Sequence, residues 1–300
     1  MNGMQFRQDA LIRPEDLQAI DRVVYEPKKE ELIGRSLFSV KSDVPPAAET
    51  YGYDVITRSG SAKILAPGAD DIPLVDADKR RKKVDIYSIV TAIRYSITEL
   101  RQAQMAGIPV DSAKAEWARR AIAEKENRII WHGDKKYNIP GVVNAEGIQT
   151  LAVDSGAGGS AKWKDKTGRE IVDDIRKARS LVNRLPGHKA NTLVLTPGGM
   201  EALEREYNAN TDKTVMEYIR SQGWFSNIVA TSDLEGQGDA GTDCFLVLDN
   251  SSSVIQILIT MDIVRHPEEY KFPNYKVPFE ERLGGAVVRY PMAIVRGDGI

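Results

Sequence analysis

Residues 112–133 of the chain read SAKAEWARRAIAEKENRIIWHG, and this stretch decides the architecture. It contains no proline, and its apolar side chains recur with the spacing of one helix face. A glycine follows at position 133, where a helix commonly ends. The pattern predicts a single helix from Ser112 to His132, which would be about 32 Å long at 1.5 Å per residue. That length is unusual for a helix of a globular domain.

Charged residues of alternating sign follow the same helix at steps of four. They are Glu116, Arg120, Glu124 and Arg128. Side chains four residues apart are neighbours on a helix surface, so this stripe can hold ion pairs along its own helix. A solvated helix face and a contact with another subunit both fit the stripe.

Upstream of the helix, residues 49–95 have the pattern of a long two-stranded hairpin. Tyr51, Tyr53 and Val55 alternate with polar residues, as in a half-exposed strand. A loop is expected at 66–73, and a second strand from about Arg80 to Tyr95 becomes apolar on both faces, as if it entered a core. The first strand, 49–65, could reach about 56 Å at 3.3 Å per residue. An isolated hairpin is marginal in water, so we expect it to lie on another copy of the chain.

The second strand of this hairpin carries the sharpest charge feature of the sequence. Residues 76–85 contain five basic and three acidic residues, a local net charge of +2. A nucleic-acid patch usually has a larger excess or interleaved aromatic residues. The run therefore predicts a docking surface for acidic groups of a neighbour. Its candidate contact residues are Arg80, Arg81, Lys82 and Lys83, and the candidate acidic partners are Glu30, Glu31, Glu268, Glu269, Glu280 and Glu281.

The remaining chain alternates helices and strands. Helices are predicted at 96–107, 167–185, 197 onward and 214–222, and the first two begin with the capping boxes of Ser96 and Thr167. Strands are predicted at 191–195, 227–231, 243–249, 254–264 and 284–296. Residues 150–165 are rich in Gly, Ser and Ala and predict a flexible loop. Residues 1–48 contain four prolines and few apolar residues, which predicts an arm without a core of its own.

The composition is that of an ordinary soluble globular chain. Of 300 residues, 41 are Lys or Arg and 43 are Asp or Glu, a net charge of −2, which argues against a dedicated nucleic-acid binder. Cys244 is the sole cysteine, so no intrachain disulfide can form and a reducing cytoplasm is the expected environment. Neither a signal peptide nor a membrane-spanning apolar run is recognisable.

Catalytic and cofactor motifs are missing from the sequence. The three histidines, His132, His188 and His266, have no second ligand at metal-site spacing. Cys244 lies in an apolar strand, where a buried structural role is expected. Residues 236–241 match G-x-G-x-x-G, but a strand follows them where a dinucleotide site needs a helix. We therefore expect no enzyme, no cofactor and no metal; a nucleotide-binding enzyme built on 190–250 is the less favoured reading.

Several short segments together resemble the tailed-phage major capsid proteins and the encapsulin shell proteins, which share the Hong-Kong-97-type fold. The most specific is ENRIIWHG at 126–133, followed by IPGVVN at 139–144. Supporting segments are GRSLFSV at 34–40, ADDIPL at 69–74 and YPMAI at 290–294. Each segment alone is a weak signal, but the resemblance extends over nearly the whole chain.

The resemblance implies an α+β capsid fold with an N-terminal arm (1–48), an extended hairpin or E-loop (49–95), a peripheral domain with the spine helix (96–165), an axial domain (166–255) and a return to the peripheral domain (256–300). It implies a structural protein that self-assembles through pentamers and hexamers into an icosahedral phage head around the DNA genome. The virion would be assembled in the host cytoplasm, with scaffolding, portal or decoration proteins as further partners. DNA would be a non-specific neighbour. An encapsulin-type nanocompartment around a cargo enzyme is the alternative.

Two further points depend on the resemblance. Some family members join a lysine of the loop covalently to an asparagine of a neighbour, and Lys63 lies in the corresponding loop. No motif identifies a partner asparagine, so Lys63 is kept only as a candidate inter-subunit contact. The arm begins close to Met1, which implies that scaffolding is supplied by a separate protein or is not used.

Overall fold

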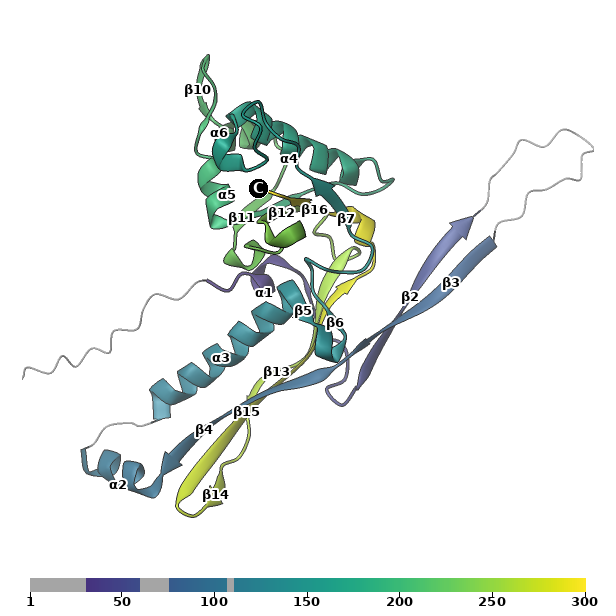
Figure 1. The fold of residues 1–300 in the computed structure, drawn as a ribbon. Helices are drawn as coiled ribbons and strands as arrows, with labels where there is room; N and C mark the ends of the chain where they lie inside the picture. Colours follow the sequence, from purple (N-terminus) through teal and green to yellow (C-terminus); the bar gives the residue numbers. More distant parts are fainter. Residues whose placement is uncertain (1–30, 60–75, 107–110) are drawn as a thin grey trace, which may run out of the picture. The chain divides into compact units, whose positions relative to one another are not determined.

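The computed structural model describes residues 31–59, 76–106 and 111–300, and residues 32–300 form one compact unit. This unit contains two five-stranded sheets, each with helices against it (Figure 1). The long helix α3 (Asp111–His132) belongs to the first sheet, and α4 (Gly168–Asn183) covers the second. The short helix α1 (Gly34–Leu37) lies against α3, and α2 (Ile97–Ala106) follows strand β4.

Helix α3 confirms the predicted long helix to within one residue at its start. It ends where Gly133 takes a φ of +66°, a conformation that glycine adopts without strain. The chain then folds back on the last turn, and the Val142 N–H donates to the Ile130 carbonyl oxygen at 2.9 Å. The short strands β5 (Gly133–Asp134) and β6 (Ile139–Pro140) pair antiparallel and fix this return. The two most specific sequence segments are therefore two sides of one structural unit.

The first sheet has the strand order β1-β13-β15-β14, with β4 paired to β15. Its strands are β1 (Val40–Lys41), β4 (Tyr87–Ser96), β13 (Ile255–Arg265), β14 (Glu269–Lys271) and β15 (Asn274–Val288). One face packs on α3 through a cluster that includes Ile122, Tyr95 and Phe279. Val90 and Val264 are exposed, with 68% and 40% of their surface accessible. The first sheet thus has one covered face and one open face.

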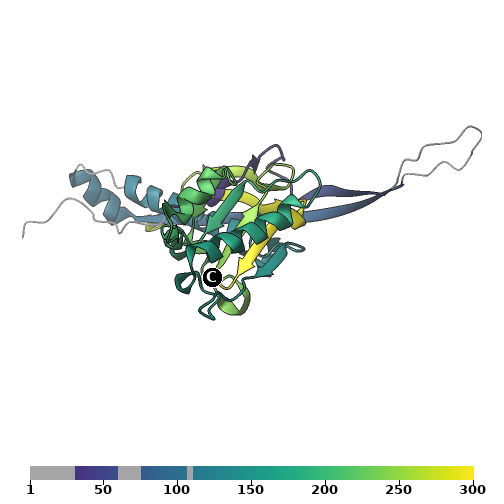
Figure 2. The same cartoon turned by 90° about the horizontal axis from the view of Figure 1, so that it is seen from above.

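The hairpin consists of β2 (Thr50–Ser59) and β3 (Asp76–Asp85), paired antiparallel from Thr50 opposite Asp85 to Ser59 opposite Asp76. Its ribbon runs beyond the strands of both sheets in Figure 1 and Figure 2. The predicted strand from Arg80 to Tyr95 is wrong in one respect, because it is divided at Ile86 into β3 and β4. The Ile86 N–H donates to the Glu49 carbonyl oxygen at 2.8 Å, and its side chain is buried. This division lets β3 pair with β2 while β4 joins the sheet.

The second sheet has the order β11-β8-β12-β16-β7. Its strands are β7 (Gln149–Ala152), β8 (Thr192–Leu195), β11 (Asn227–Ala230), β12 (Cys244–Leu248) and β16 (Ile294–Asp298). Helices α5 (Pro197–Ala202) and α6 (Val215–Ser221) complete this part, with the hairpin of β9 (Glu206–Asn208) and β10 (Thr211–Thr214). The predicted capping boxes of Ser96 and Thr167 are confirmed, and Thr196 caps α5.

Three local predictions differ from the structure. Residues 150–165 are not simply a flexible loop, because Trp163 is buried and packs 5.0 Å from the ring of Phe245. The predicted strand 284–296 is the end of β15 and the start of β16, separated by a turn at Pro291–Ala293, since proline cannot donate to a strand ladder. Strand β4 was expected to be apolar and buried on both faces, but its exposed and half-buried residues alternate.

Candidate functional site

The basic run lies on β3, where its side chains divide between the two faces of the hairpin. Successive strand residues point to opposite faces, so Arg80 and Lys82 share one face and Arg81 and Lys83 share the other. All four residues are exposed. Lys82 Nζ lies 4.0 Å from the Glu146 carboxylate, at the limit of an ion pair. The predicted basic surface is therefore two smaller surfaces, one on each side of a thin ribbon.

A groove of about 470 Å³ lies at the base of the hairpin. Lys82, Lys83 and Lys135 line it, with Glu146 as its acidic member. Tyr53 also lines it, and its hydroxyl donates to the Val288 carbonyl oxygen at 3.2 Å, which joins the hairpin to strand β15. Burial raises the pKa of this phenol. The hairpin base is thus anchored to the first sheet, with a net positive groove beside it.

Two neighbouring residues of the charged stripe on α3 form an ion pair in the structure. Arg120 Nε lies 2.9 Å from Glu124 Oε1, as a helix pair with i,i+4 spacing. Glu116 and Arg128 are exposed at either end of the stripe. An exposed pair of this kind contributes little to stability. The stripe remains a prediction of a contact surface, and Lys63 lies outside the described residues.

The open face of the first sheet combines apolar and acidic groups. Strand register places Val90, Glu280 and Val264 in one row across β4, β15 and β13. Glu280 accepts hydrogen bonds from Ser88 at 2.6 Å and His266 at 2.8 Å, and both partners lower its pKa. Beside this row, a groove of about 520 Å³ is lined by residues that include the exposed Glu268 and Glu269.

The predicted acidic partners differ in how accessible they are to a neighbouring subunit. Glu268 and Glu269 are accessible, while Glu280 is already held by Ser88 and His266. Glu281 was expected to be available to a neighbour, and this is wrong. Its accessible surface is 0%, because β15 turns it toward α3 on the covered face of the sheet. Glu30 lies outside the described residues.

Sequence reasoning missed a charged cluster that attaches helix α1 to α3. The Gly34 N–H donates to Asn127 Oδ1 at 3.0 Å, and a Cβ at Gly34 would lie 2.7 Å from that oxygen. Arg35 lies beside Asp262 and is 3.6 Å from Glu126 and 3.7 Å from Glu281. Burial, and next the charge of Glu126, raises the pKa of Glu281 to about 8. The only sequence signal was the GRSLFSV segment, which has no charge pattern pointing to these partners.

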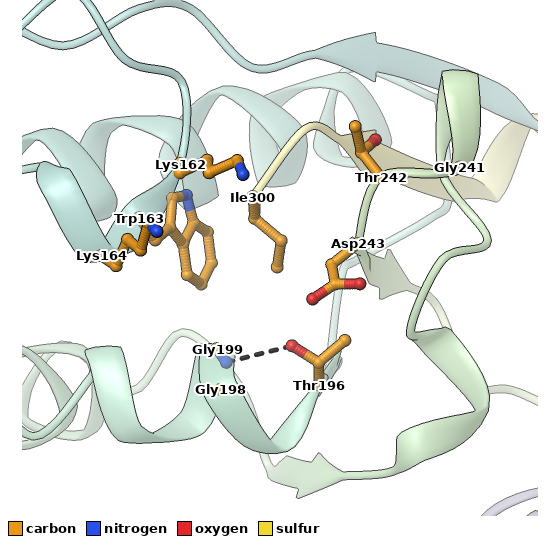
Figure 3. Close-up of a pocket in the computed structure, with 10 residues that line it drawn as sticks. All are labelled: Lys162, Trp163, Lys164, Thr196, Gly198, Gly199, Gly241, Thr242, Asp243 and Ile300. Carbon is orange, nitrogen blue, oxygen red and sulfur yellow. Dashed lines mark hydrogen bonds between the residues drawn. The ribbon is translucent and has the colours of Figure 1, made fainter.

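A further pocket of about 420 Å³ lies beside the second sheet (Figure 3). It is the place where the nucleotide-binding reading would need a ligand. Asp243 accepts the Gly236 N–H at 2.8 Å, Thr196 accepts the Gly199 N–H at 3.0 Å, and the Ile300 side chain points into the space. Gly241, the last glycine of G-x-G-x-x-G, ends a short turn that leads to β12, as predicted. Asp243 and Thr196 in the wall thus hold neighbouring backbone groups of the local fold.

The three histidines each face one carboxylate. His132 is 3.5 Å from Asp233, His188 is 3.0 Å from Asp249, and His266 is 2.8 Å from Glu280. Within residues 31–59, 76–106 and 111–300, no group of three or more His, Cys, Asp or Glu residues could hold a metal ion. None of the helices described there is long and apolar enough to span a membrane.

Cys244 is buried, as predicted, and its thiol donates to the Leu234 carbonyl oxygen at 3.4 Å. Burial raises the pKa of this thiol to about 12. A thiolate is the reactive form of cysteine, so this residue is unsuited to nucleophilic chemistry.

Comparison with known proteins gives a consistent result. A family model described as "Major capsid protein" matches residues 60–300. The type 1 encapsulin shell protein EncA of Myxococcus xanthus is 21% identical over 255 residues, covering 84% of this chain and 82% of that protein. The capsid of Myoviridae phage XM1 superposes with a TM-score of 0.80 at 14% identity, covering 98% of this chain and 100% of the other. The virus-like particle of Pyrococcus furiosus gives a TM-score of 0.60 at 14% identity, with 88% and 91% covered.

Proposed function

The chain belongs to the major capsid protein family and has the Hong-Kong-97-type fold, and from this premise we propose that its copies assemble through pentamers and hexamers into an icosahedral phage head enclosing a DNA genome. The observation that carries the proposal is the combination of a projecting hairpin with an open sheet face. An isolated hairpin gains little stability in water, and the exposed Val90 and Val264 leave apolar surface uncovered. When the hairpin of one copy lies on the open sheet face of another, the hairpin gains a supporting surface and the apolar side chains are covered. The subunit itself has no catalytic role and uses no cofactor.

In the proposed contact, the hairpin of one copy lies along the open face of the first sheet of its neighbour. Arg80 and Lys82, which share one face of the hairpin, would then meet Glu268 and Glu269 at the edge of that open face, and Lys83 would add positive charge from the other face of the hairpin. Such charge complementarity sets the register and orientation of a contact more than its affinity. Lys63 is kept as a further candidate residue for the same contact.

The charged stripe of α3 is proposed as a second contact surface. Glu116 and Arg128 are exposed at its two ends, and Arg120 and Glu124 lie between them. A stripe with both signs can pair with the same stripe of another copy running in the opposite direction, because each acidic residue then faces a basic one. It suits contacts between identical subunits.

Further partners and the place of assembly complete the proposal. Scaffolding, portal or decoration proteins would act with the subunit, and assembly would take place in the host cytoplasm before the subunit becomes part of the virion. DNA would be a non-specific neighbour, because the chain as a whole has a net charge of −2 and cannot neutralise phosphates in large number. Only local basic groups would touch the genome.

The second candidate is an encapsulin-type nanocompartment. The similarity to EncA of Myxococcus xanthus over 84% of this chain favours it. The two candidates share the shell and differ in its contents, which are DNA in one case and a cargo protein in the other.

The experiment is to express the chain alone and with candidate scaffolding proteins, then apply sedimentation velocity and negative-stain electron microscopy. Closed shells are the expected product. A strictly monomeric chain at high concentration under all these conditions would overturn the proposal. Shells purified from the native source would contain DNA if the phage reading is right, whereas a co-purifying protein cargo without DNA would select the encapsulin reading.

A further inference from the structure

The starting point is a pair of carboxylates buried between α3 and the first sheet. Glu281 on β15 has 0% and Glu126 on α3 has 3% of its surface accessible. Both oxygens of Glu281, and Oε1 of Glu126, receive no hydrogen bond from any other described residue. A buried carboxylate without donors is costly when charged, so this arrangement needs a specific compensation.

The pair and the charged groups around it come from four elements, α3, β15, α1 and β13. Arg35 on α1 places its Nη1 at 3.6 Å from Glu126 and 3.7 Å from Glu281. Asp262 on β13 contacts Arg35 from the solvent side and is 72% exposed. One guanidinium thus faces three carboxylates. Arg35 is thus shared with the exposed Asp262, which leaves the buried pair with less than one positive charge between them.

A shared proton resolves this imbalance. Two buried carboxyls that lie within 3.7 Å of the same guanidinium nitrogen cannot both ionise readily, so one of them holds a proton. Burial raises the pKa of both groups, and the contact with Glu126 adds to the effect at Glu281. Loss of the proton of Glu281 as the pH rises therefore adds one negative charge to the buried pair.

We propose that Glu126 and Glu281 form a proton-sensitive seat for Arg35, and that loss of their shared proton tightens the attachment of helix α1 to α3. With the proton present, Arg35 faces one buried negative charge, and without it Arg35 faces two. Linkage then works in both directions: any event that pulls Arg35 away raises the proton affinity of the pair. Helix α1 is thereby coupled to the protonation of a buried carboxylate pair between α3 and the first sheet.

Loss of the proton affects the attachment of α1 and the stability of the whole fold in opposite directions. Full ionisation of the pair has a desolvation cost, so the global stability falls as the proton leaves. The local attachment of Arg35 becomes stronger in the same pH range. A measurement confined to α1 can therefore distinguish the tighter attachment of Arg35 from a general change of stability with pH.

The test is hydrogen–deuterium exchange of residues 33–38 in the full chain between pH 6 and 9.5, corrected for intrinsic exchange rates and performed in one verified assembly state. Protection of this segment in the wild type should rise by roughly threefold to tenfold between pH 7 and 9. Glu281→Gln removes the group whose pKa is raised to about 8, so this variant should show a flat profile. Glu126→Gln removes a charge that adds to the raised pKa of Glu281, so in this variant the rise should begin at a lower pH than in the wild type.

The matched control is Glu201→Gln, which removes an exposed carboxylate of α5, a helix that packs on the second sheet. This variant should keep the rise of the wild type. A flat or falling profile in the wild type would overturn the proposal, and so would a rise that persists unchanged in both Gln variants. Because the two Gln substitutions lie on different elements, the test stands if one of them fails to fold.

Discussion

Asp54 on β2 and Arg81 on β3 lie directly opposite each other across the hairpin, and Arg81 Nε is 2.9 Å from Asp54 Oδ1. A cross-strand ion pair of this kind fixes the local register of the two strands. It also means that Arg81 already has an acidic partner within its own subunit. The positive charge that the basic run offers to a neighbour therefore comes from its other members, which include Lys82 and Lys83.

Reversing the charge of these lysines should impair assembly. For the double variant Lys82→Glu and Lys83→Glu, we expect the assembled fraction in sedimentation velocity to fall at least about tenfold, because like charges would meet at the acidic edge of the neighbour's sheet. The control is Lys162→Glu with Lys189→Glu, which makes the same change at exposed lysines near the second sheet. Equal assembly of the two double variants would contradict the proposed contact.

Where the chain folds back on the end of α3, Gly133 and Gly141 come so close together that neither position should tolerate a side chain. A Cβ at Gly141 would lie 2.3 Å from the Gly133 nitrogen, and a Cβ at Gly133 would lie 2.2 Å from the Ile139 carbonyl oxygen. Backbone atoms cannot yield at such distances, so Gly141→Ala should lower the yield of folded protein severely. Gly198→Ala, whose Cβ would meet nothing within 4 Å, is the control and should be neutral in thermal unfolding. Similar melting temperatures for both variants would contradict the close crossing.

The buried ion pair of Lys166 and Asp174 should matter far more than exposed pairs. Lys166 Nζ is 2.6 Å from Asp174 Oδ2, and Trp163 donates to the same oxygen at 3.2 Å. Asp174→Asn leaves a buried lysine without its counter-charge, which should lower the free energy of unfolding by about 3–5 kcal/mol in urea titrations. Replacing both members, Lys166→Met with Asp174→Leu, should recover most of this loss. The exposed Lys177→Met is the control with little effect, and a double variant as unstable as the single one would argue against the pair.

Stability should fall as the pH rises through the range in which Glu281 holds its proton. Its pKa is about 8 in the folded chain against an ordinary value of 4.5, so the folded state binds more protons than the unfolded state between these values. The free energy of unfolding then decreases with pH by at most about 1.4 kcal/mol per unit and levels off above pH 8. Denaturant unfolding from pH 5 to 9 measures this slope. Subtracting the Glu281→Gln curve from the wild-type curve should isolate it, and a difference that does not vary with pH would refute the assignment.

Cys244 should be inert toward thiol reagents in the native state. Its thiol is buried with a pKa raised to about 12, so neither access nor thiolate is available at pH 8. Reaction with an aromatic disulfide reagent should proceed at the rate of unfolding, and the same chain in urea should react at once. Rapid labelling of the native protein would show that β12 is accessible.

The features that could be predicted from the sequence are those specified by neighbouring residues. The helix before Gly133, the capping boxes of Ser96 and Thr167, and the alternation from Thr50 onward all depend on contacts within a few residues along the chain. The family resemblance supplied the arrangement of these elements. The domain boundaries and the candidate contact residues remain predictions.

The features that could not be predicted depend on partners distant in sequence. Arg35 meets Asp262 across 227 residues, and no local pattern marks either residue. Glu281 follows another glutamate in a sequence that looks solvent-exposed, but the alternation of β15 turns only one of the two inward. The division at Ile86 likewise needs the Glu49 carbonyl group, which the sequence does not place beside it.

The continuity of β3 into β4 through Ile86 gives the subunit a mechanical property. A pull along β3 on the hairpin would pass through one covalent backbone into β4, whose ten paired positions with β15 lie along the direction of the pull. Hydrogen bonds perpendicular to such a force are strained together, in shear, rather than broken one after another. Strand β3 of the hairpin is therefore held in the first sheet by all the paired positions of β4. Tension between neighbouring subunits would be distributed over the whole first sheet.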